Sequence, residues 1–261
     1  MTFSWYKNFS INLLKIFDMK KIILNSVLLL FSMVLCAQSV VVDYEQTKHM
    51  KIGGDNPNDT HKLMMQVYSR PTYYKLFIFK DKSLYQKQEV VDNGQKRYIL
   101  PVQGEVKVES VLTNYADKKQ IQEAIYARKK FWVESQLQQN YQWELKDGEQ
   151  EILGLLCRKA VAKTDTGIVI TAWYTNDVPY KMGPLDYYGL PGLIMKVVSH
   201  PENQPENNVE TIAINIGEQK NIPSIEKFNK NKTISSDEFQ KLIKDHLDQL
   251  KMMRGGGVNR D

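Results

Sequence analysis

The chain has 261 residues, of which 42% are hydrophobic and 25% are charged. These are ordinary globular values, so they exclude a disordered chain and leave room for one large domain or two small ones. The formal net charge is +5, but four lysines and one aspartate lie within residues 1–37. Without that segment the charge falls to +2. Charge alone therefore gives no reason to expect binding to nucleic acid or to an anionic membrane surface.

Residues 19–37 have the pattern of a secretory signal peptide. Met19-Lys20-Lys21 is followed by the largely apolar run Ile22–Leu35 and then by Cys36-Ala37, which matches a positive start, an apolar middle and a small residue at the cleavage site. The run of 14 residues is too short to span a bilayer, which needs roughly 20. We favour cleavage after Ala37 over lipidation of Cys36, because the preceding Leu35 is not small.

The sequence therefore predicts an exported protein, periplasmic or associated with the outer membrane. Its mature chain, residues 38–261, is predicted to form one domain without a transmembrane span. Residues 1–18 precede a complete signal and are interpreted as an upstream extension from a misassigned start codon. The mature chain keeps one cysteine, Cys157, which cannot form an internal disulfide. Its apolar neighbours Ile152–Leu156 favour a buried thiol over a reactive nucleophile.

Most of the mature chain has the alternating apolar pattern of strands separated by turn residues. The predicted strands are Val40–Tyr44, His61–Ser69, Tyr73–Phe79, Leu84–Gln88, Arg97–Leu100, Val106–Asn114, Phe131–Val133, Trp143–Leu145, Ile152–Lys163, Ile168–Thr175, Leu193–Val198 and Val209–Ile216. The run Ile121–Arg128 fits either a helix or a strand. Asp147-Gly148 is predicted to be the turn before Ile152–Lys163, and Thr164–Gly167 is predicted to be a hairpin turn.

The end of the chain predicts a helix over Asp237–Met253. Ser235–Glu238 has the Ser-x-x-Glu pattern of a capping box, and three glycines at 255–257 follow the helix. The apolar stripe of this helix consists of Phe239, Ile243, Leu247 and Leu250, and Met253 is expected to continue it into the core. Together these elements predict an α+β, mostly β fold: a curved antiparallel sheet from residue 40 to about 216, packed against the C-terminal helix.

Residues 176–192 form a long predicted loop with a rigid backbone. Its proline and glycine residues are Pro179, Gly183, Pro184, Gly189, Pro191 and Gly192, and Tyr180, Tyr187 and Tyr188 lie between them. A loop of this length is usually functional or packed on itself. Its end, Leu190-Pro191-Gly192-Leu193, predicts a type II turn with Gly192 at positive φ, which leads into the next strand.

The chain shows no sequence signature of catalysis. Gly-x-Ser-x-Gly and His-Glu-x-x-His are absent, and His49, His61, His200 and His246 are scattered along the sequence. A hydrolase needs a nucleophile, a base and an orienting group, and no such set can be named here. The glycines of the long loop lack the following helix and lysine of a phosphate-binding loop. We therefore predict no catalytic residue and favour a non-enzymatic protein.

Metal binding finds weak support. Met64-Met65, Met252-Met253 and His246 supply soft or borderline ligands. Adjacent residues of a strand point to opposite faces, and the spacing of a metal site is missing. The sequence predicts no metal and no cofactor; a copper chaperone and an uncharacterised hydrolase are kept as alternatives.

A cleft is the remaining type of site. A curved sheet with a helix against it can enclose an apolar cavity, and the loop 176–192 would lie at its rim. The candidate rim residues are Tyr180, Tyr187, Tyr188 and Leu190. Apolar faces that simply pack together would show the same periodicity, so the sequence leaves both interpretations open.

Two blocks of residues resemble a known family. Ala172–Thr175 (with Trp173), Val178-Pro179, Gly183-Pro184 and Gly189–Ile194 are similar to the signature of the GLPGLI family. Upstream, Ile152-x-Gly154-x-x-Cys157-x-Lys159-Ala160 resembles the second block of that family, except that Leu155 stands where an aromatic residue is usual. The resemblance covers about Trp143–Val198 strongly and the rest of the chain by its layout. In this resemblance Trp173, Pro179, Gly183, Pro184, Gly189, Pro191, Gly192 and Cys157 are structural motif residues.

The resemblance implies an exported protein of the Bacteroidota type with a β-rich body, often encoded beside outer-membrane transporters. It supplies no catalytic or ligand-binding residue, because no activity is established for that family. By analogy its architecture is compatible with the curved-sheet carriers of envelope lipoproteins. We therefore expect an envelope protein that binds a hydrophobic small molecule or an outer-membrane or transport partner, and no nucleic acid.

Overall fold

A computed structural model describes residues 39–51, 69–89, 105–137, 141–219, 221 and 223–255. The chain divides after Gln38 into two units, Met1–Gln38 and Ser39–Asp261, and all the described residues belong to the second unit. The boundary falls next to the predicted cleavage site, but the signal peptide itself lies outside the described residues and stays a prediction.

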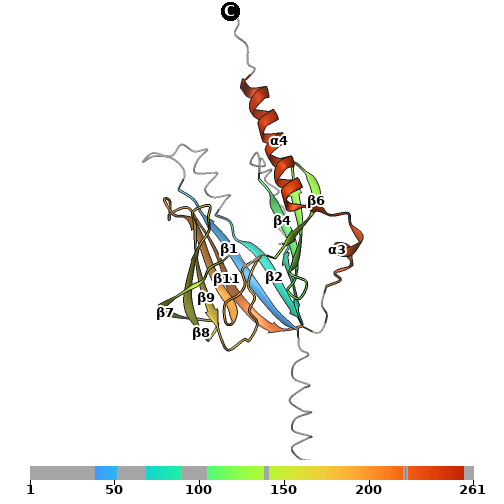
Figure 1. Ribbon diagram of the computed structural model, residues 1–261. Coiled ribbons are helices and arrows are strands. Elements are labelled where there is room, and N and C mark those ends of the chain that lie inside the picture. Colours follow the sequence, from blue (N-terminus) through green and yellow to red (C-terminus); the bar gives the residue numbers. More distant parts are fainter. Residues whose placement is uncertain are drawn as a thin grey trace, which may run out of the picture. The chain divides into compact units, whose positions relative to one another are not determined.

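Twelve strands form one open sheet. The strands are β1 (Val40–His49), β2 (Thr72–Phe79), β3 (Lys82–Lys87), β4 (Lys107–Asn114), β5 (Lys119–Tyr126), β6 (Lys129–Gln136), β7 (Glu144–Ile152), β8 (Leu155–Lys163), β9 (Ile168–Thr175), β10 (Leu193–Pro201), β11 (Asn208–Glu218) and β12 (Ile234–Ser235). Their order is β12-β6-β5-β4-β3-β2-β1-β11-β10-β9-β8-β7. All neighbouring strands run antiparallel except β12, which pairs in parallel with β6. The strongly curved sheet brings the arm β7–β11 opposite the arm β4–β6 (Figure 1).

Both faces of the central strands are buried. On β1, Val42 and Tyr44 belong to a core cluster with the neighbouring Leu76, whereas Val41 belongs to another cluster with Phe77. Successive side chains of a strand point to opposite faces, so the two clusters lie on opposite sides of the sheet. The face of Val42 is covered by the loop 176–192, which we call the inner loop, and the face of Val41 by residues 223–233, which we call the strap.

The strand predictions are confirmed wherever the structure describes them, apart from one turn. Ile121–Arg128, left open between helix and strand, is mostly β5. The predicted strand Arg97–Leu100 and nearly all of His61–Ser69 lie outside the described residues, so the predicted meander of 61–88 is seen only as β2 and β3. The predicted hairpin turn at Thr164–Gly167 joins β8 to β9, with Gly167 at a φ of 77°.

The prediction of a turn at Asp147-Gly148 is wrong. These residues lie within β7, where the pairing with β8 shifts between Lys146 and Glu149 and Gly148 has a φ of 137°. The turn is Leu153-Gly154, both at positive φ (54° and 77°). Two consecutive residues at positive φ match the twist of a tight hairpin, whereas an extra residue within a strand makes a bulge. The glycine at 148 therefore marks an irregular strand, and the predicted strand Ile152–Lys163 begins only at Leu155.

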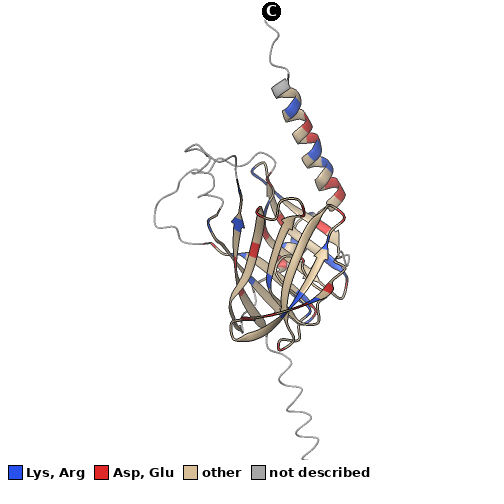
Figure 2. Ribbon diagram, turned by 90° about the vertical axis from the view of Figure 1, so that its left-hand side faces the viewer, with Lys and Arg blue, Asp and Glu red and all other residues tan. Residues whose placement is uncertain are grey.

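The C-terminal helix α4 (Ser236–Gly255) packs against the sheet through its first half. The backbone N–H of Glu238 donates to Ser235 Oγ (3.2 Å), and the N–H of Ser235 donates to Glu238 Oε2 (2.9 Å), so the capping box is confirmed. Phe239 is buried against Tyr126 and Phe131. The expectation for Met253 is wrong, since its side chain is 77% exposed beyond the last contact with the sheet. Basic and acidic residues alternate along α4 (Figure 2).

The strap contains a short helix that the sequence did not reveal, α3 (Glu226–Lys230). Phe228 is 1% exposed and meets the ring of Trp132 edge to face at 5.2 Å. Beside it, Lys227 Nζ lies 2.8 Å from Glu123 Oε2 and donates to Ser110 Oγ. Burial alone would raise the pKa of Glu123, but hydrogen bonds from Lys130, Lys227 and Ser110 outweigh it and lower the pKa to about 2.

Candidate functional site

The inner loop is held to the sheet by backbone hydrogen bonds and by apolar side chains that pack into the core. The N–H of Leu193 donates to Val178 O (3.1 Å), and the N–H of Ile194 donates to Met182 O (2.9 Å). Within the loop, the N–H of Gly189 donates to Lys181 O, and Met182 pairs with Tyr188 in an isolated bridge. The loop is therefore packed on itself and on the start of β10, as a compact surface loop is.

A glycine is needed at position 192 because there is no room for a Cβ atom, and not because the backbone has a positive φ. The predicted type II turn is wrong, because Gly192 is not among the glycines at positive φ, whereas Gly189 is (95°). A Cβ on Gly192 would lie 1.8 Å from the carbonyl oxygen of Thr175, at the end of β9. The backbone of the loop end therefore touches the backbone of the preceding strand, an approach that only glycine permits.

Other motif residues serve packing as well. A Cβ on Gly183 would lie 2.7 Å from Ile194 Cβ, and the adjoining Pro184 is buried. Cys157 is fully buried in the largest core cluster, and burial raises the pKa of its thiol to about 11. Trp173 packs against the same cluster, with Lys159 Nζ 5.8 Å from its ring centre. Pro179 and Pro191 are exposed.

The structure separates the four candidate rim residues. Leu190 is 1% exposed and lies in a core cluster with Ile194 and Val197. Tyr180 packs against the largest core cluster. Tyr187 is half-buried, with its ring 5.2 Å from that of Tyr141. Of the four, Tyr188 lines a cleft.

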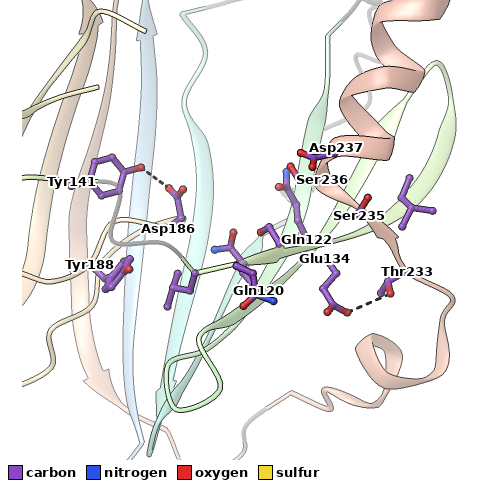
Figure 3. A pocket seen from close by; sticks show the side chains of 14 residues that line it. Gln120, Gln122, Glu134, Tyr141, Asp186, Tyr188, Thr233, Ser235, Ser236 and Asp237 are labelled. Carbon is purple, nitrogen blue, oxygen red and sulfur yellow. Dashed lines mark hydrogen bonds between the residues drawn. The ribbon is translucent and has the colours of Figure 1, made fainter. Parts of the chain in front are cut away.

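That cleft has a volume of about 720 Å³ and lies between the inner loop and the opposite arm of the sheet. Tyr141, Asp186 and Tyr188 form one side, and β5, β6 and the start of α4 form the other (Figure 3). The second side presents amides and hydroxyls: Gln120, Gln122, Gln136, Ser135, Thr233, Ser235 and Ser236. Leu137 and Ile234 are the aliphatic residues of the described lining. The cleft is therefore mostly polar, with two aromatic rings at one side.

Three carboxyl groups line the cleft. The hydroxyl of Tyr141 donates to Asp186 Oδ1 (3.2 Å), and burial raises the pKa of this half-buried aspartate. Glu134 forms an ion pair with Lys119 (Nζ to Oε1, 3.1 Å) and accepts a hydrogen bond from the hydroxyl of Thr233 (3.5 Å). Asp237 is exposed in the first turn of α4.

The tyrosines near Asp186 stay protonated at neutral pH. Burial, followed by the charge of Asp186, raises the pKa of Tyr187 to about 12 and raises those of Tyr141 and Tyr188. Burial likewise raises the pKa of Tyr115, which touches the ring of Tyr188 edge to face at 5.8 Å, to about 12. Of these hydroxyls, that of Tyr188 lines the cleft and can therefore act as a hydrogen-bond donor toward a bound molecule.

Two further cavities are less suited to a ligand. One of about 930 Å³ lies beside the strap, but its two more buried acidic residues are already paired, Glu109 with Lys87 and Glu123 with Lys130 and Lys227, and its third, Glu89, is exposed. The other, of about 700 Å³, lies between β5, β6 and α4. The cleft between the arms is smaller than the first cavity but offers unpaired polar groups together with aromatic rings, so we take it as the candidate site.

The described residues carry no assembled catalytic or metal-binding set. His246 faces the hydroxyl of Tyr126 (2.9 Å) and His200 the carbonyl of Pro201 (2.9 Å), both away from the lining of the cleft. In the same part of the chain no group of three or more His, Cys, Asp or Glu side chains could hold a metal ion. Met64-Met65 lies outside the described residues, as does His61. Among the described helices, none is long and apolar enough to cross a membrane.

Sequence reasoning missed most of the cleft. Tyr141, Asp186, Gln120 and Gln122 meet there from three distant segments. One local signal existed, because Asp186 is an acidic residue placed directly before Tyr187-Tyr188 in a loop rich in Pro and Gly.

The comparisons with known proteins agree with the fold and leave the function open. Residues 111–196 match a family model described as "Protein of unknown function (Porph_ging)", a range that runs from β4 into β10 and includes Gly189–Ile194. The match covers less than half of the chain, so the GLPGLI name stays a prediction. A search of curated proteins gives no significant match.

Solved structures show the same type of fold. Two crystal structures of PNGF-II superpose with TM-scores of 0.53 and 0.51 at 17% identity, covering 79% of this chain. The chain spans about a third (33%) of the length of PNGF-II. A LolA superfamily protein from Nitrosomonas europaea matches 72% of this chain and 89% of its own length at 7% identity, but with a TM-score of 0.29. At these identities the likeness to PNGF-II concerns the fold alone, and the last score is too low to support a common fold.

Proposed function

We propose that the chain is an exported, non-enzymatic protein of the cell envelope that binds a ligand in the cleft between the two arms of its sheet. The observation that carries this proposal is the cleft itself: Tyr141, Asp186 and Tyr188 face β5, β6 and α4 across about 720 Å³ (Figure 3). A volume of this size suits a small molecule. The predicted signal at 19–37 supports a location in the periplasm or at the outer membrane.

The side that carries the aromatic rings is rigid, which favours binding. The indole N–H of Trp143 donates to Tyr188 O (2.9 Å), and the N–H of Ile194 in β10, whose carbonyl accepts the hydroxyl of Tyr44 (2.6 Å), donates to Met182 O (2.9 Å). These hydrogen bonds hold the inner loop to Trp143 on one side and to β10 on the other in the absence of a ligand. A preorganised site loses less conformational entropy on binding than a mobile one.

The lining favours a ligand with polar groups over a purely hydrophobic one. An apolar ligand would leave the amide and hydroxyl side chains of the lining without hydrogen-bond partners, and burying them unpaired costs free energy. The apolar side chains of the inner face are meanwhile packed against Met182 and Leu185 of the inner loop. The sequence instead led us to expect a hydrophobic molecule or a transport partner. The following experiment distinguishes these alternatives from a polar ligand.

The test is native mass spectrometry of the chain produced with its own leader and purified from the cell envelope. We expect a co-purified polar small molecule that is lost in Tyr188→Ala and kept in Tyr73→Ala, a matched tyrosine that lines the cavity beside the strap. A co-purified lipid would favour the hydrophobic ligand instead. A protein that binds nothing, or that loses its ligand equally in both variants, would contradict the cleft as the site.

A further inference from the structure

The balance of charge in the cleft indicates the class of its ligand. Glu134, Asp186 and Asp237 line the cleft, and the described lining contains no Lys, Arg or His. Glu134 is paired with Lys119. Asp186 has the hydroxyl of Tyr141 as its side-chain partner and no cation within ion-pair distance in the part of the chain that the structure describes. The cleft therefore has an excess of negative charge.

Most carboxylates of the sheet that are half-buried or buried have a lysine beside them: Asp43 has Lys75 (3.3 Å), Glu210 has Lys196 (3.0 Å) and the buried Glu123 has Lys227 (2.8 Å). Glu45, which accepts a hydrogen bond from Tyr73, is an exception. Removing a carboxylate from water costs free energy unless a partner compensates it. Among the described residues, Asp186 lacks the lysine partner that these other carboxylates have.

The rings beside Asp186 suit a cation as well. Tyr141 and Tyr188 are the aromatic residues of the lining and lie with Asp186 at one side of the cleft (Figure 3). A cation over the face of an aromatic ring is attracted by the negative potential of that face, and the attraction strengthens as water is excluded. The amide oxygens of Gln120 and Gln122 can accept further N–H donors from the opposite side.

We infer that the ligand of the cleft is an aliphatic amine in its protonated form, with the ammonium group placed between the carboxylate of Asp186 and the rings of Tyr141 and Tyr188. This inference rests on the proposed function and names the ligand class of the same site. Phosphorylated and carboxylate ligands are disfavoured, because they would meet three acidic side chains and no basic one.

The test is an NMR titration of the isotope-labelled mature chain with 1,4-diaminobutane and, separately, with 1,4-butanediol, which has the same length and no charge. We expect the diamine to shift the amide signals of Asp186, Tyr188 and Gln122 with a Kd at least tenfold below that of the diol, and to bind more weakly as salt is added. Asp186→Asn should raise the Kd for the diamine about tenfold or more. Asp165→Asn, a matched change in the exposed hairpin turn between β8 and β9, should leave it unchanged.

Equal binding of diamine and diol, or an unchanged Kd in Asp186→Asn, would overturn the amine inference. A diol or another neutral molecule that shifts the cleft signals while the diamine does not would overturn it and leave the proposed function intact. If neither compound shifts those signals, the amine inference fails, and the co-purified ligand in native mass spectrometry decides the proposed function independently.

Discussion

The inner loop and the strap cover opposite faces of the same central strands, but they are attached in different ways. The inner loop is held by backbone hydrogen bonds, by the backbone contact at Gly192 and by apolar side chains such as Met182 and Leu190. The strap is held by side chains, namely Phe228 and the pairing of Lys227 with Glu123. The attachment of the inner loop leaves Asp186 and Tyr188 facing a cleft, whereas the strap uses its charged Lys227 for attachment.

The two acidic residues next to these segments show the same difference. Glu123 beside the strap has a pKa lowered to about 2, because hydrogen bonds from two lysines and a serine outweigh its burial. Asp186 in the inner loop has a raised pKa, because burial dominates and no cation among the described residues compensates it. One carboxylate stabilises the fold, and the other is costly to keep charged in the folded chain.

The largest expected effect tests the backbone attachment of the inner loop. Gly192→Ala should destabilise the protein by about 3 kcal/mol, since the new Cβ would meet the Thr175 carbonyl and force the loop away from β9. Gly217→Ala is the control, because a Cβ there meets nothing within 4 Å. Urea unfolding of both variants measures the difference. Equal stability of the two would show that the loop end can shift freely.

The next effect tests the charged attachment of the strap. Glu123→Gln should lower the free energy of unfolding at pH 7 by about 2 kcal/mol, a value reduced because the lysine partners are half-exposed. The lowered pKa of Glu123 means that its contribution is complete above about pH 4.5 and is lost as the pH falls toward 2. Denaturation measured across this range should show the wild type approaching the variant. Glu149→Gln, at an exposed ion pair, should change almost nothing.

A smaller effect is expected where the strap ends and α4 begins. Ser235→Ala removes the hydroxyl that accepts the N–H of Glu238 and should cost about 1 kcal/mol. Hydrogen exchange should quicken in the first turn of α4 and stay unchanged in the inner loop. Faster exchange in both segments would mean that the two attachments are coupled across the sheet.

The smallest effect concerns Asp186 in the absence of ligand. Its raised pKa means that the folded state binds the proton more tightly, so the wild type loses stability as the pH rises from the ordinary aspartate range through the raised value. Asp186→Asn has no carboxyl group at this position and does not lose stability in this way. Its melting temperature should be slightly higher than that of the wild type at pH 7, and the two should be equal at pH 3. A variant that melts lower at pH 7 would indicate a structural cation beside the carboxylate.

Local patterns in the sequence predicted the elements well. The capping box of α4 involves residues three positions apart, Ser235 and Glu238, and the hairpin turn at Thr164–Gly167 is equally local. The curved sheet with a helix packed against it followed from the alternation of apolar residues. Gly148 shows the limit, because the same glycine can mark a turn or a bulge, and the choice depends on pairing with β8.

What the sequence by itself determined was therefore which residues form strands and turns and where the last helix begins, since these depend on neighbours a few positions away. The tertiary structure decided the rest. Gly192 is required by a carbonyl 17 positions earlier, Asp186 meets Tyr141 across 45 positions, and Glu123 meets Lys227 across 104. Periodicity reports which face a side chain occupies but not which segment covers that face. The cleft exists because the loop that covers one face leaves Asp186 and Tyr188 available, and that arrangement arises only once the sheet has curved.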